Sequence, residues 1–343
     1  MVRGRYGTRV LLVVTDERCI HHSAGRNHPE RPDRLVAALD GVAQAGIDDA
    51  LRWVVPRQAS FEELARVHDP ELLDSIRAFD EAGGGRVDPD TAMNAASLEA
   101  ALLAAGSVLS AVHDLSTGDA AAAYCVVRPP GHHATASRSM GFCLFNSVAV
   151  AAAHLVDQGE RVAIVDIDAH HGNGTQDIFF AEPRVLYASI HQSPLYPGTG
   201  AVTETGEGDA VGTTLNVPLP PGATGDVARS AIDQVIGPAI ERFAPTWVLI
   251  SAGYDGHRAD PLTELGYSSA DIADLVGTIM TLGPEGRLVT VLEGGYDLDA
   301  IRDSSAAVAA RLLGVDHRPE SPTVGGPGME SVAAAVRIHG PRS

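Results

Sequence analysis

The chain has 343 residues, of which 45% are hydrophobic, so it can bury the core of one large domain or of two smaller ones. Acidic residues outnumber basic ones by 44 to 25, and the formal charge of −19 disfavours nucleic acid as a partner, because its affinity comes largely from Lys and Arg on phosphates. No apolar run approaches the roughly 20 residues of a membrane helix, so we expect no membrane association.

The basic start of the chain leads into only five apolar-to-neutral residues, 10–14, which predicts a first strand and not a secretory signal. Three cysteines, Cys19, Cys125 and Cys143, are an odd number without paired spacing. We therefore expect free thiols and a cytoplasmic protein. The sequence is compatible with a monomer or an oligomer.

Short apolar runs alternate with helical patterns through the first half of the chain. The predicted strands are 10–15, 53–55 and 124–127, and the predicted helices begin at Pro32, after a capping box at Ser60, at Val67 and at Ser97. Between the last two helices, residues 81–96 are rich in Gly and Asp and are predicted as the clearest loop. A loop of that length in a compact domain is usually functional or mobile.

The second half continues the alternation. Strands are predicted at 161–166, 185–190, 246–251 and 287–292, and helices at 145–158, 175–181, 227–243, 299–313 and after a Ser269 cap. From Val315 the chain is rich in Pro and Gly, so we predict a main domain over 1–317 and a loosely packed tail over 318–343. Alternating strands and helices predict an α/β fold: a mostly parallel central sheet with helices on both faces.

The stretch Arg161-Val-Ala-Ile-Val-Asp-Ile-Asp-Ala-His-His-Gly-Asn-Gly174 begins as a buried strand and ends in polar residues. Side chains two apart along an extended chain share a face, so Asp166, Asp168 and His170 can point the same way. An Asp-x-His pair offers one oxygen and one nitrogen ligand to a divalent metal. For one strand alone, a solvated turn is more often the explanation of such a pattern.

Three further strands also end in residues that can carry chemistry. The four groups, in chain order, are His132 and His133; Asp166, Asp168 and His170; Asp255; and Tyr296. The carboxyl ends of parallel strands lie on one edge of a sheet, where ligands bind, so these side chains can converge. Asp168, His170 and Asp255 would leave a metal with open coordination, which is typical of catalytic zinc.

Five motifs resemble those of the zinc-dependent histone deacetylase family, which includes bacterial deacetylase-like and acetylpolyamine amidohydrolases. They are Arg128-Pro-Pro-Gly-His-His-Ala134, Asp166-Ile-Asp-Ala-His-His-Gly-Asn-Gly-Thr175, Tyr196-Pro-Gly-Thr-Gly200, Ala252-Gly-Tyr-Asp255 and Glu293-Gly-Gly-Tyr296. The resemblance runs from about His28 to Leu313 in the family's order, and its details are closer to the class II branch. It implies the arginase-like α/β fold in a single domain.

The resemblance also implies the metal sites. Zinc would be bound by Asp168, His170 and Asp255. A structural potassium ion would be bound by the side chains of Asp166 and Ser189 with the backbone carbonyls of Asp166, Asp168 and His170.

Catalytic roles follow from the same resemblance. His133 would be the general base and acid, His132 its electrostatic partner oriented by Asp166, and Tyr296 the group that polarises the amide carbonyl. Asn173 stands where class I members carry Asp beside the second histidine. An uncharged partner stabilises an imidazolium less, so His133 should be a weaker base.

A narrow acyl-lysine tunnel is the last feature that the resemblance implies. Phe142 and Tyr196 would form its walls, and the other substrate-binding candidates are Asp90 at the rim, Leu262 at the mouth, Gly141 and Gly294. Three residues near the site are interpreted as structural: His171 and His191 as hydrogen-bonded histidines, and Cys143 as a packing residue.

The substrate would be an acylated lysine peptide or an acetylated small amine. Polyamine-selective members of the class II branch carry a Glu where this chain has Leu262, and an apolar residue there suits the stem of a lysine side chain. In the opposite interpretation Leu262 only packs, and Asp88 and Asp90 serve polyamines. A third hypothesis, a binding module with weak turnover, is disfavoured because Tyr296 is present.

Overall fold

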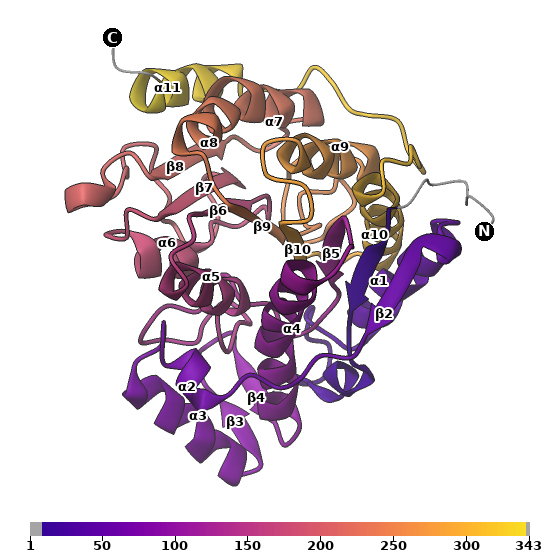
Figure 1. Cartoon of the computed structure of the whole chain (residues 1–343), viewed down its shortest axis with the longest axis vertical. Coiled ribbons are helices and arrows are strands. Elements are labelled where there is room, and N and C mark those ends of the chain that lie inside the picture. Colours follow the sequence, from indigo (N-terminus) through magenta and orange to yellow (C-terminus); the bar gives the residue numbers. More distant parts are fainter. Residues whose placement is uncertain (1–8, 341–343) are drawn as a thin grey trace.

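An eight-stranded parallel sheet lies at the centre of the structure, a computed structural model that describes residues 9–340 (Figure 1). The predicted mostly parallel sheet is confirmed, whereas the prediction about a secretory signal concerns residues largely outside the described range. In order across the sheet the strands are β2 (Leu51–Val54), β1 (Leu11–Val14), β5 (Ala122–Cys125), β10 (Leu288–Leu292), β9 (Trp247–Ala252), β6 (Val162–Asp166), β7 (Val185–Gln192) and β8 (Thr214–Leu219).

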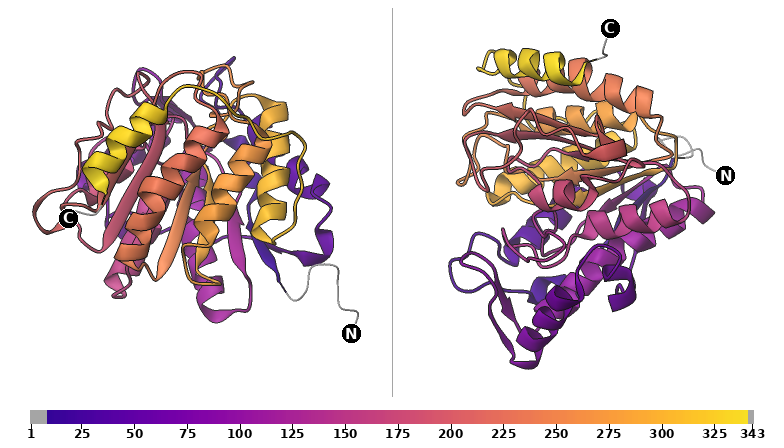
Figure 2. Two further views of the ribbon diagram at one scale, coloured as in Figure 1. Left: turned by 90° about the horizontal axis from the view of Figure 1, so that it is seen from above. Right: turned by 90° about the vertical axis from the view of Figure 1, so that its left-hand side faces the viewer.

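Helices cover both faces of this sheet, as predicted. In Figure 2, α7 to α11 lie over one face, and α2 to α5 lie on the other side. The helices are α1 (Asp33–Gln44), α2 (Phe61–Leu64), α3 (Pro70–Glu81), α4 (Ser97–Thr117), α5 (Ser147–Asp157), α6 (Asn173–Phe179), α7 (Gly225–Ala231), α8 (Gly237–Phe243), α9 (Ser269–Met280), α10 (Leu298–Leu312) and α11 (Met329–His339). Because both faces are covered, every residue of β6 is buried.

The strand β8 was missed in the sequence. It contains Pro218, which lacks the N–H that a central strand needs and so argues against a strand. The structure resolves the conflict by placing β8 at the edge of the sheet, where it pairs only with β7. An edge strand has one unpaired side and tolerates proline.

Three smaller differences concern element boundaries. The predicted loop 81–96 contains a short antiparallel hairpin, β3 (Gly84–Arg86) and β4 (Ala92–Asn94). The helix expected over 227–243 is α7 and α8 joined by one π-turn. The cap of α9 is Ser268, not Ser269: the Ser268 side chain accepts the Asp271 amide in a capping box.

The expectation of a loosely packed tail is wrong for its described part. Residues 315–328 run in extended form to α11, which packs against α7 and β8 and buries Val332 and Ala335. The segment hydrogen-bonds to α9 through Thr323, whose amide and hydroxyl both donate to Asp271. Pro and Gly therefore give an extended path here, while polar side chains fix it in place.

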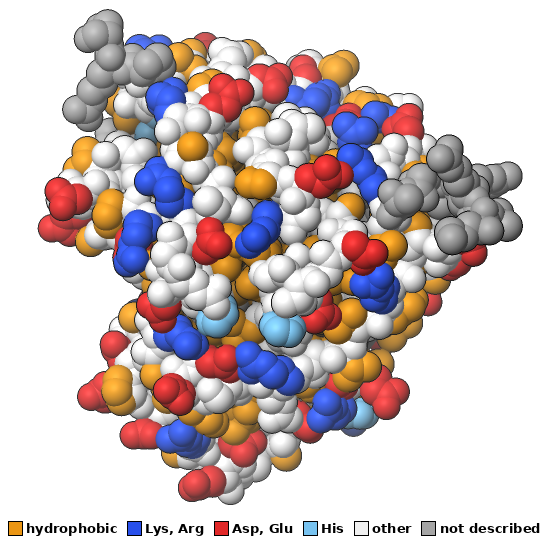
Figure 3. All heavy atoms as spheres, in the orientation of Figure 1, with side chains coloured by type: hydrophobic (Ala, Val, Ile, Leu, Met, Phe, Trp, Pro, Cys, Tyr) orange, Lys and Arg blue, Asp and Glu red, His pale blue; other side chains and the backbone are white. Residues whose placement is uncertain are grey.

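Among residues 9–340, α4 is the one helix long and apolar enough to cross a membrane by length and composition, and 72% of its most apolar window is buried in the protein. All three cysteines are free, as predicted, and all three are buried. On the face seen in Figure 3, basic and acidic side chains are interspersed over the surface.

Candidate active site

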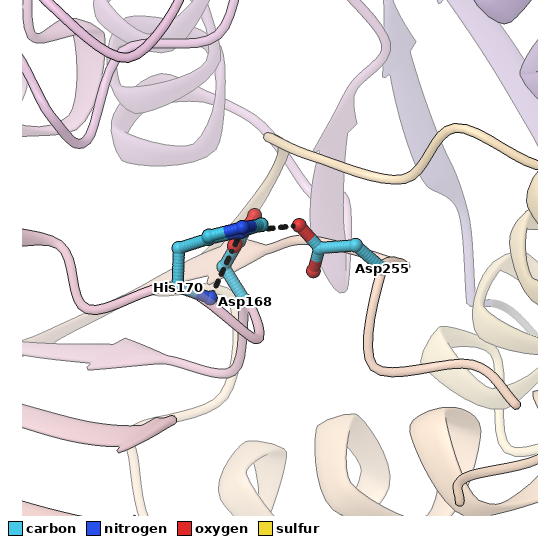
Figure 4. A group of neighbouring side chains, drawn as sticks. All are labelled: Asp168, His170 and Asp255. Carbon is cyan, nitrogen blue, oxygen red and sulfur yellow. Dashed lines mark hydrogen bonds and ion pairs between the residues drawn. The ribbon is translucent and has the colours of Figure 1, made fainter. Parts of the chain in front are cut away.

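Three buried side chains that can bind a metal meet at the carboxyl ends of β6 and β9. Asp168 and His170 follow β6, Asp255 follows β9, and one ligand atom of each lies within 4.8 Å of the others. Figure 4 shows the imidazole and the two carboxylates turned toward one another. His170 Nδ1 lies 2.9 Å from Asp255 Oδ2 and 3.2 Å from Asp168 Oδ1. The predicted convergence of these strand ends is thus observed.

Backbone amides hold both carboxylates in place. The Ala169 amide donates to Asp255 Oδ1 (2.8 Å), and the Gly294 amide donates to Asp168 Oδ2 (2.8 Å). A Cβ on Gly294 would lie 2.4 Å from Asp255 Oδ2 and 2.6 Å from Asp168 Oδ2. Gly294, predicted as a substrate-binding residue, therefore makes room for the carboxylates, and it is not among the residues that line the nearby pocket described below.

The chemistry of these donors fits a divalent cation. Burial and, after it, the carboxylate of Asp168 together raise the pKa of Asp255 to about 6, although His170 opposes the shift. Two crowded, buried carboxylates are stable in the charged form when a cation lies between them. Two oxygens and one imidazole nitrogen are ligands that zinc accepts, with a coordination position left for water or substrate.

Two histidines from the loop after β5 lie next to this group. The rings of His132 and His133 are 4.0 Å apart between centroids. His132 Nδ1 lies 3.0 Å from Asp166 Oδ2, whereas His133 Nδ1 lies 2.8 Å from the amide oxygen of Asn173. The structure thus places a carboxylate behind the first histidine and a neutral amide behind the second, as the sequence predicted.

These partners give the two rings opposite electrostatics. Burial alone would lower the pKa of His132, but the carboxylates of Asp168 and Asp166 outweigh burial and raise the pKa well above its usual value. Burial lowers the pKa of His133, and the positive charges of His132 and His170 lower it further. His133 is therefore held neutral and can accept a proton, the state that a general base needs.

Tyr296 follows β10 and reaches the same region. Its amide donates to Asp260 Oδ2 (2.7 Å), and its ring packs edge-on against Phe142 with centroids 5.8 Å apart. Burial raises the pKa of its hydroxyl well above the usual value, although the nearby Arg34 guanidinium opposes the shift. The phenol stays protonated and can donate a hydrogen bond.

A pocket of about 250 Å³ opens above these groups. Its lining combines reactive and apolar side chains: Asp90, His133, Gly141, Phe142, His170, Leu195, Tyr196, Leu262 and Tyr296. Tyr196 and Leu262 are each 38% exposed, so they mark the mouth. Every predicted substrate-binding residue except Gly294 lines this pocket, and Leu195 is a wall residue that the sequence analysis missed.

The Gly141–Phe142 wall is fixed from the β3–β4 hairpin. The Gly141 amide donates to Asp90 Oδ1 (3.1 Å), and the Phe142 amide donates to Thr91 Oγ1 (3.0 Å). Both Gly141 and Phe142 have positive φ values, 57° and 68°. A Cβ on Gly141 would lie 2.4 Å from the His133 ring, so glycine is required for the wall to approach the histidine.

The residues expected to bind potassium are neighbours on adjacent strands. Asp166 on β6 pairs in register with Ser189 on β7. Ser189 Oγ lies 2.9 Å from His191 Nδ1, and the other ring nitrogen of His191 lies 3.1 Å from the Gly200 carbonyl. His171 is bonded on both nitrogens as well, to Thr199 and Gln176. The prediction of structural roles for His171 and His191 is confirmed.

A buried ionic network behind Tyr296 was missed in the sequence. The guanidinium of Arg34 donates to Glu30 Oε1 (3.0 Å) and to the carbonyls of Gly295 and Glu293 (2.5 Å each). Glu30 also pairs with the buried Arg128, so two arginines share one carboxylate. Glu30 and Arg34 are four residues apart, but no local pattern signals the contact between Arg34 and Gly295, which are 261 residues apart.

Comparison with known proteins agrees with this geometry. The family model described as "Histone deacetylase domain" matches residues 28–312. A probable deacetylase of Archaeoglobus fulgidus is 38% identical over 90% of this chain and 87% of its own length. A histone deacetylase-like amidohydrolase of Pseudomonas aeruginosa is 35% identical, with the same shares covered.

The fold leads to the same conclusion. The crystal structure of the HDA15 HD domain superposes with a TM-score of 0.89 at 37% identity, covering 97% of this chain and 95% of that one. This match confirms the predicted single-domain deacetylase-like α/β fold, and the relatives support a hydrolase that acts on amides. The chain belongs to the histone deacetylase family.

Proposed function

We propose that the protein is a zinc-dependent amidohydrolase that removes acetyl, or a similar short acyl group, from lysine-like amines. One observation carries the proposal: His170 of the metal-ligand group, the neutral His133 and Tyr296 all line the same pocket of about 250 Å³. Metal, base and hydrogen-bond donor at one concave site form the arrangement of an amide hydrolase.

The side chains would divide the reaction between them. Nε2 of His133 accepts a proton from the attacking water and returns it to the leaving amine. The Tyr296 hydroxyl donates to the oxygen on which negative charge develops. The paired His132 and Asp166 contribute a fixed electrostatic field beside the His133 ring. When bound, zinc would polarise the amide oxygen and lower the pKa of water toward roughly 7.

The pocket walls support a substrate with an apolar stem. Phe142, Leu195, Tyr196 and Leu262 contribute rings and aliphatic side chains to the lining. Such walls suit the methylene chain of an acyl-lysine, whose peptide backbone would remain at the mouth. Asp90 is the rim carboxylate, and its Oδ1 already accepts the Gly141 amide.

An acetylated polyamine is the second candidate substrate, because Asp90 lines the pocket and a second carboxylate, Asp88, lies beside it. Asp88 Oδ2 lies 3.6 Å from Arg138, and its other oxygen accepts the Asp90 amide (3.1 Å). Asp88 is thus already paired with a cation, which weakens its attraction for a polyamine. A third hypothesis, acyl-lysine binding without turnover, is disfavoured by the position of Tyr296 in the pocket.

The test is acetate release by purified, zinc-loaded protein from an acetyl-lysine peptide, acetylputrescine and acetylspermidine. We expect hydrolysis that a chelator abolishes and zinc restores, and none with Asp255→Ala. The chain contains no lysine, since all 25 basic residues are arginines, so every acetyl-lysine signal comes from the added peptide. Full activity of Asp255→Ala would refute the proposed zinc site.

The proposed potassium site, at Asp166 and Ser189, is tested by comparing the unfolding temperature of the protein in potassium salt with that in sodium salt.

A further inference from the structure

The segment between α10 and α11 lies beyond the part of the chain that matches the family model, which ends at residue 312. In Figure 2 it runs across the ends of α9 and α7 before it reaches α11. We call residues 315–328 the C-terminal strap. Arg318 fastens it to Asp274 on α9 with two hydrogen bonds (2.9 and 3.1 Å). The strap also contacts the loop that follows the metal ligand Asp255.

Glu320 makes that contact. Its Oε2 accepts the Ser269 amide (2.9 Å) and lies 2.6 Å from His257 Nε2, and its Oε1 accepts Arg258 Nη2 (2.5 Å). Burial alone would raise the pKa of Glu320, but hydrogen bonds from Ser269, His257 and Arg258 outweigh burial and lower the pKa to about 2. Charge-assisted hydrogen bonds of this kind are about twice as strong as neutral ones.

The His257 ring is fixed in one orientation. Its Nδ1 accepts the Ala259 amide (3.2 Å), so the proton lies on Nε2, which donates to Glu320. The ring is buried and lies two residues after Asp255. Glu320 therefore holds the first turn of the loop that leaves the metal-ligand group.

From His257 the hydrogen bonds continue to the pocket. The His257 carbonyl accepts the Asp260 amide (2.8 Å). Asp260 then bridges two parts of the site, because its Oδ2 accepts the Tyr296 amide (2.7 Å) and its Oδ1 accepts the Leu262 amide (2.9 Å). One chain of contacts thus joins the strap to the loop of Asp255, to the mouth residue Leu262 and to Tyr296.

We propose that Glu320 is a positioning residue of the active site: by holding His257 and Arg258 it fixes the loop 256–263, and the C-terminal strap is thereby part of the working enzyme. The proposal rests on the proposed amide hydrolysis for its kinetic consequence only. The order of the loop and the affinity for metal can be measured without any substrate.

The experiment compares Glu320→Ala with Arg318→Ala in the full chain. Both changes remove hydrogen bonds that hold the strap, but of these two residues only Glu320 contacts the loop 256–263. For Glu320→Ala we expect faster amide hydrogen exchange over 256–263, about tenfold weaker zinc binding and at least a tenfold lower kcat/KM. Glu320→Gln, which keeps one acceptor oxygen, should fall between. Arg318→Ala should leave all three measurements near the wild-type values.

Equal effects of Arg318→Ala and Glu320→Ala would overturn the proposal, because they would mean that the strap acts on stability alone. Unchanged exchange over 256–263 in Glu320→Ala would overturn it as well. If Glu320→Ala does not fold, Glu320→Gln and Arg258→Ala decide by the same exchange and zinc-binding measurements. If the wild-type protein hydrolyses no substrate, the proposed function fails, while exchange and zinc affinity still decide the role of Glu320.

Discussion

The Nδ1 atom of His133 donates to the side-chain amide oxygen of Asn173 over 2.8 Å. This bond fixes the tautomer, so the other ring nitrogen has a free lone pair. An amide carries no net charge and stabilises a protonated ring less than a carboxylate does. The His133 ring is thus held in one orientation, as is its neighbour His132, but its pKa is lower.

Asn173→Asp should raise the pKa of His133. The ring must be neutral to accept a proton, so activity falls as the pH drops through this pKa. A higher pKa moves that fall to higher pH, and we expect a shift of about one unit in the acidic limb of kcat/KM. The measurement is a pH profile of both proteins at saturating zinc. If the acidic limb of kcat/KM stayed at the same pH, the pKa of another group would determine it.

Tyr296→Phe should lower kcat about a hundredfold, the usual cost of removing one donor to a developing oxyanion. KM should change little, because the ring and its contact with Phe142 are retained. Tyr196→Phe is the matched control: the same atom is removed from a tyrosine at the half-exposed mouth, and kcat should stay within a few-fold of wild type. If Tyr296→Phe instead raised KM at constant kcat, the hydroxyl would be a binding group.

Gly294→Ala should weaken metal binding more than it weakens the fold. Its Cβ would contact one oxygen of each metal-binding carboxylate, of Asp255 and of Asp168. At least one carboxylate must turn away, and we expect zinc affinity to fall tenfold or more, as for other disturbances around metal ligands. Zinc titration followed by a competing chelator measures this. Activity should recover in part at high zinc, and wild-type affinity would contradict the close approach.

The sequence sufficed for the sheet and for most of the site because their signals are local. The central strands are mostly apolar runs, and Asp168 and Asp255 follow closely on the ends of β6 and β9, so the parallel topology brings them together. The alternation of strands with helices predicted that topology.

Features that depend on distant pairing were not predictable from such signals. Arg34 meets Gly295, and Glu320 meets His257, across 261 and 63 residues, and neither pair belongs to a periodic pattern. A Pro- and Gly-rich composition indicated a loose segment after Val315, but composition does not show where Glu320 or Thr323 finds a partner. β8 was missed as well; its Pro218 is disfavoured in a central strand but is tolerated here because β8 lies at the edge of the sheet.

Leu262→Glu should move substrate preference toward polyamines. Leu262 is 38% exposed at the mouth, where a carboxylate would face the distal ammonium of acetylspermidine. An exposed charge pair contributes about 0.2–1 kcal/mol, so the ratio of kcat/KM for acetylspermidine to that for an acetyl-lysine peptide should rise up to about fivefold. The gain should shrink as salt rises from low to physiological ionic strength, because exposed charges are screened.

Leu262→Gln is the control for this change, since it has the shape of Glu without its charge. It should lose apolar contact with the lysine stem but gain nothing for the polyamine. If Gln and Glu shifted the ratio equally, the effect would be one of packing at the mouth. If the wild-type protein already preferred acetylspermidine over the peptide by more than about a hundredfold, about 2.7 kcal/mol, Leu262 would not set the preference. Asp90 and its neighbour Asp88 would then be the groups to change, because Asp90 is the acidic hairpin residue that lines the pocket and Asp88 accepts its amide.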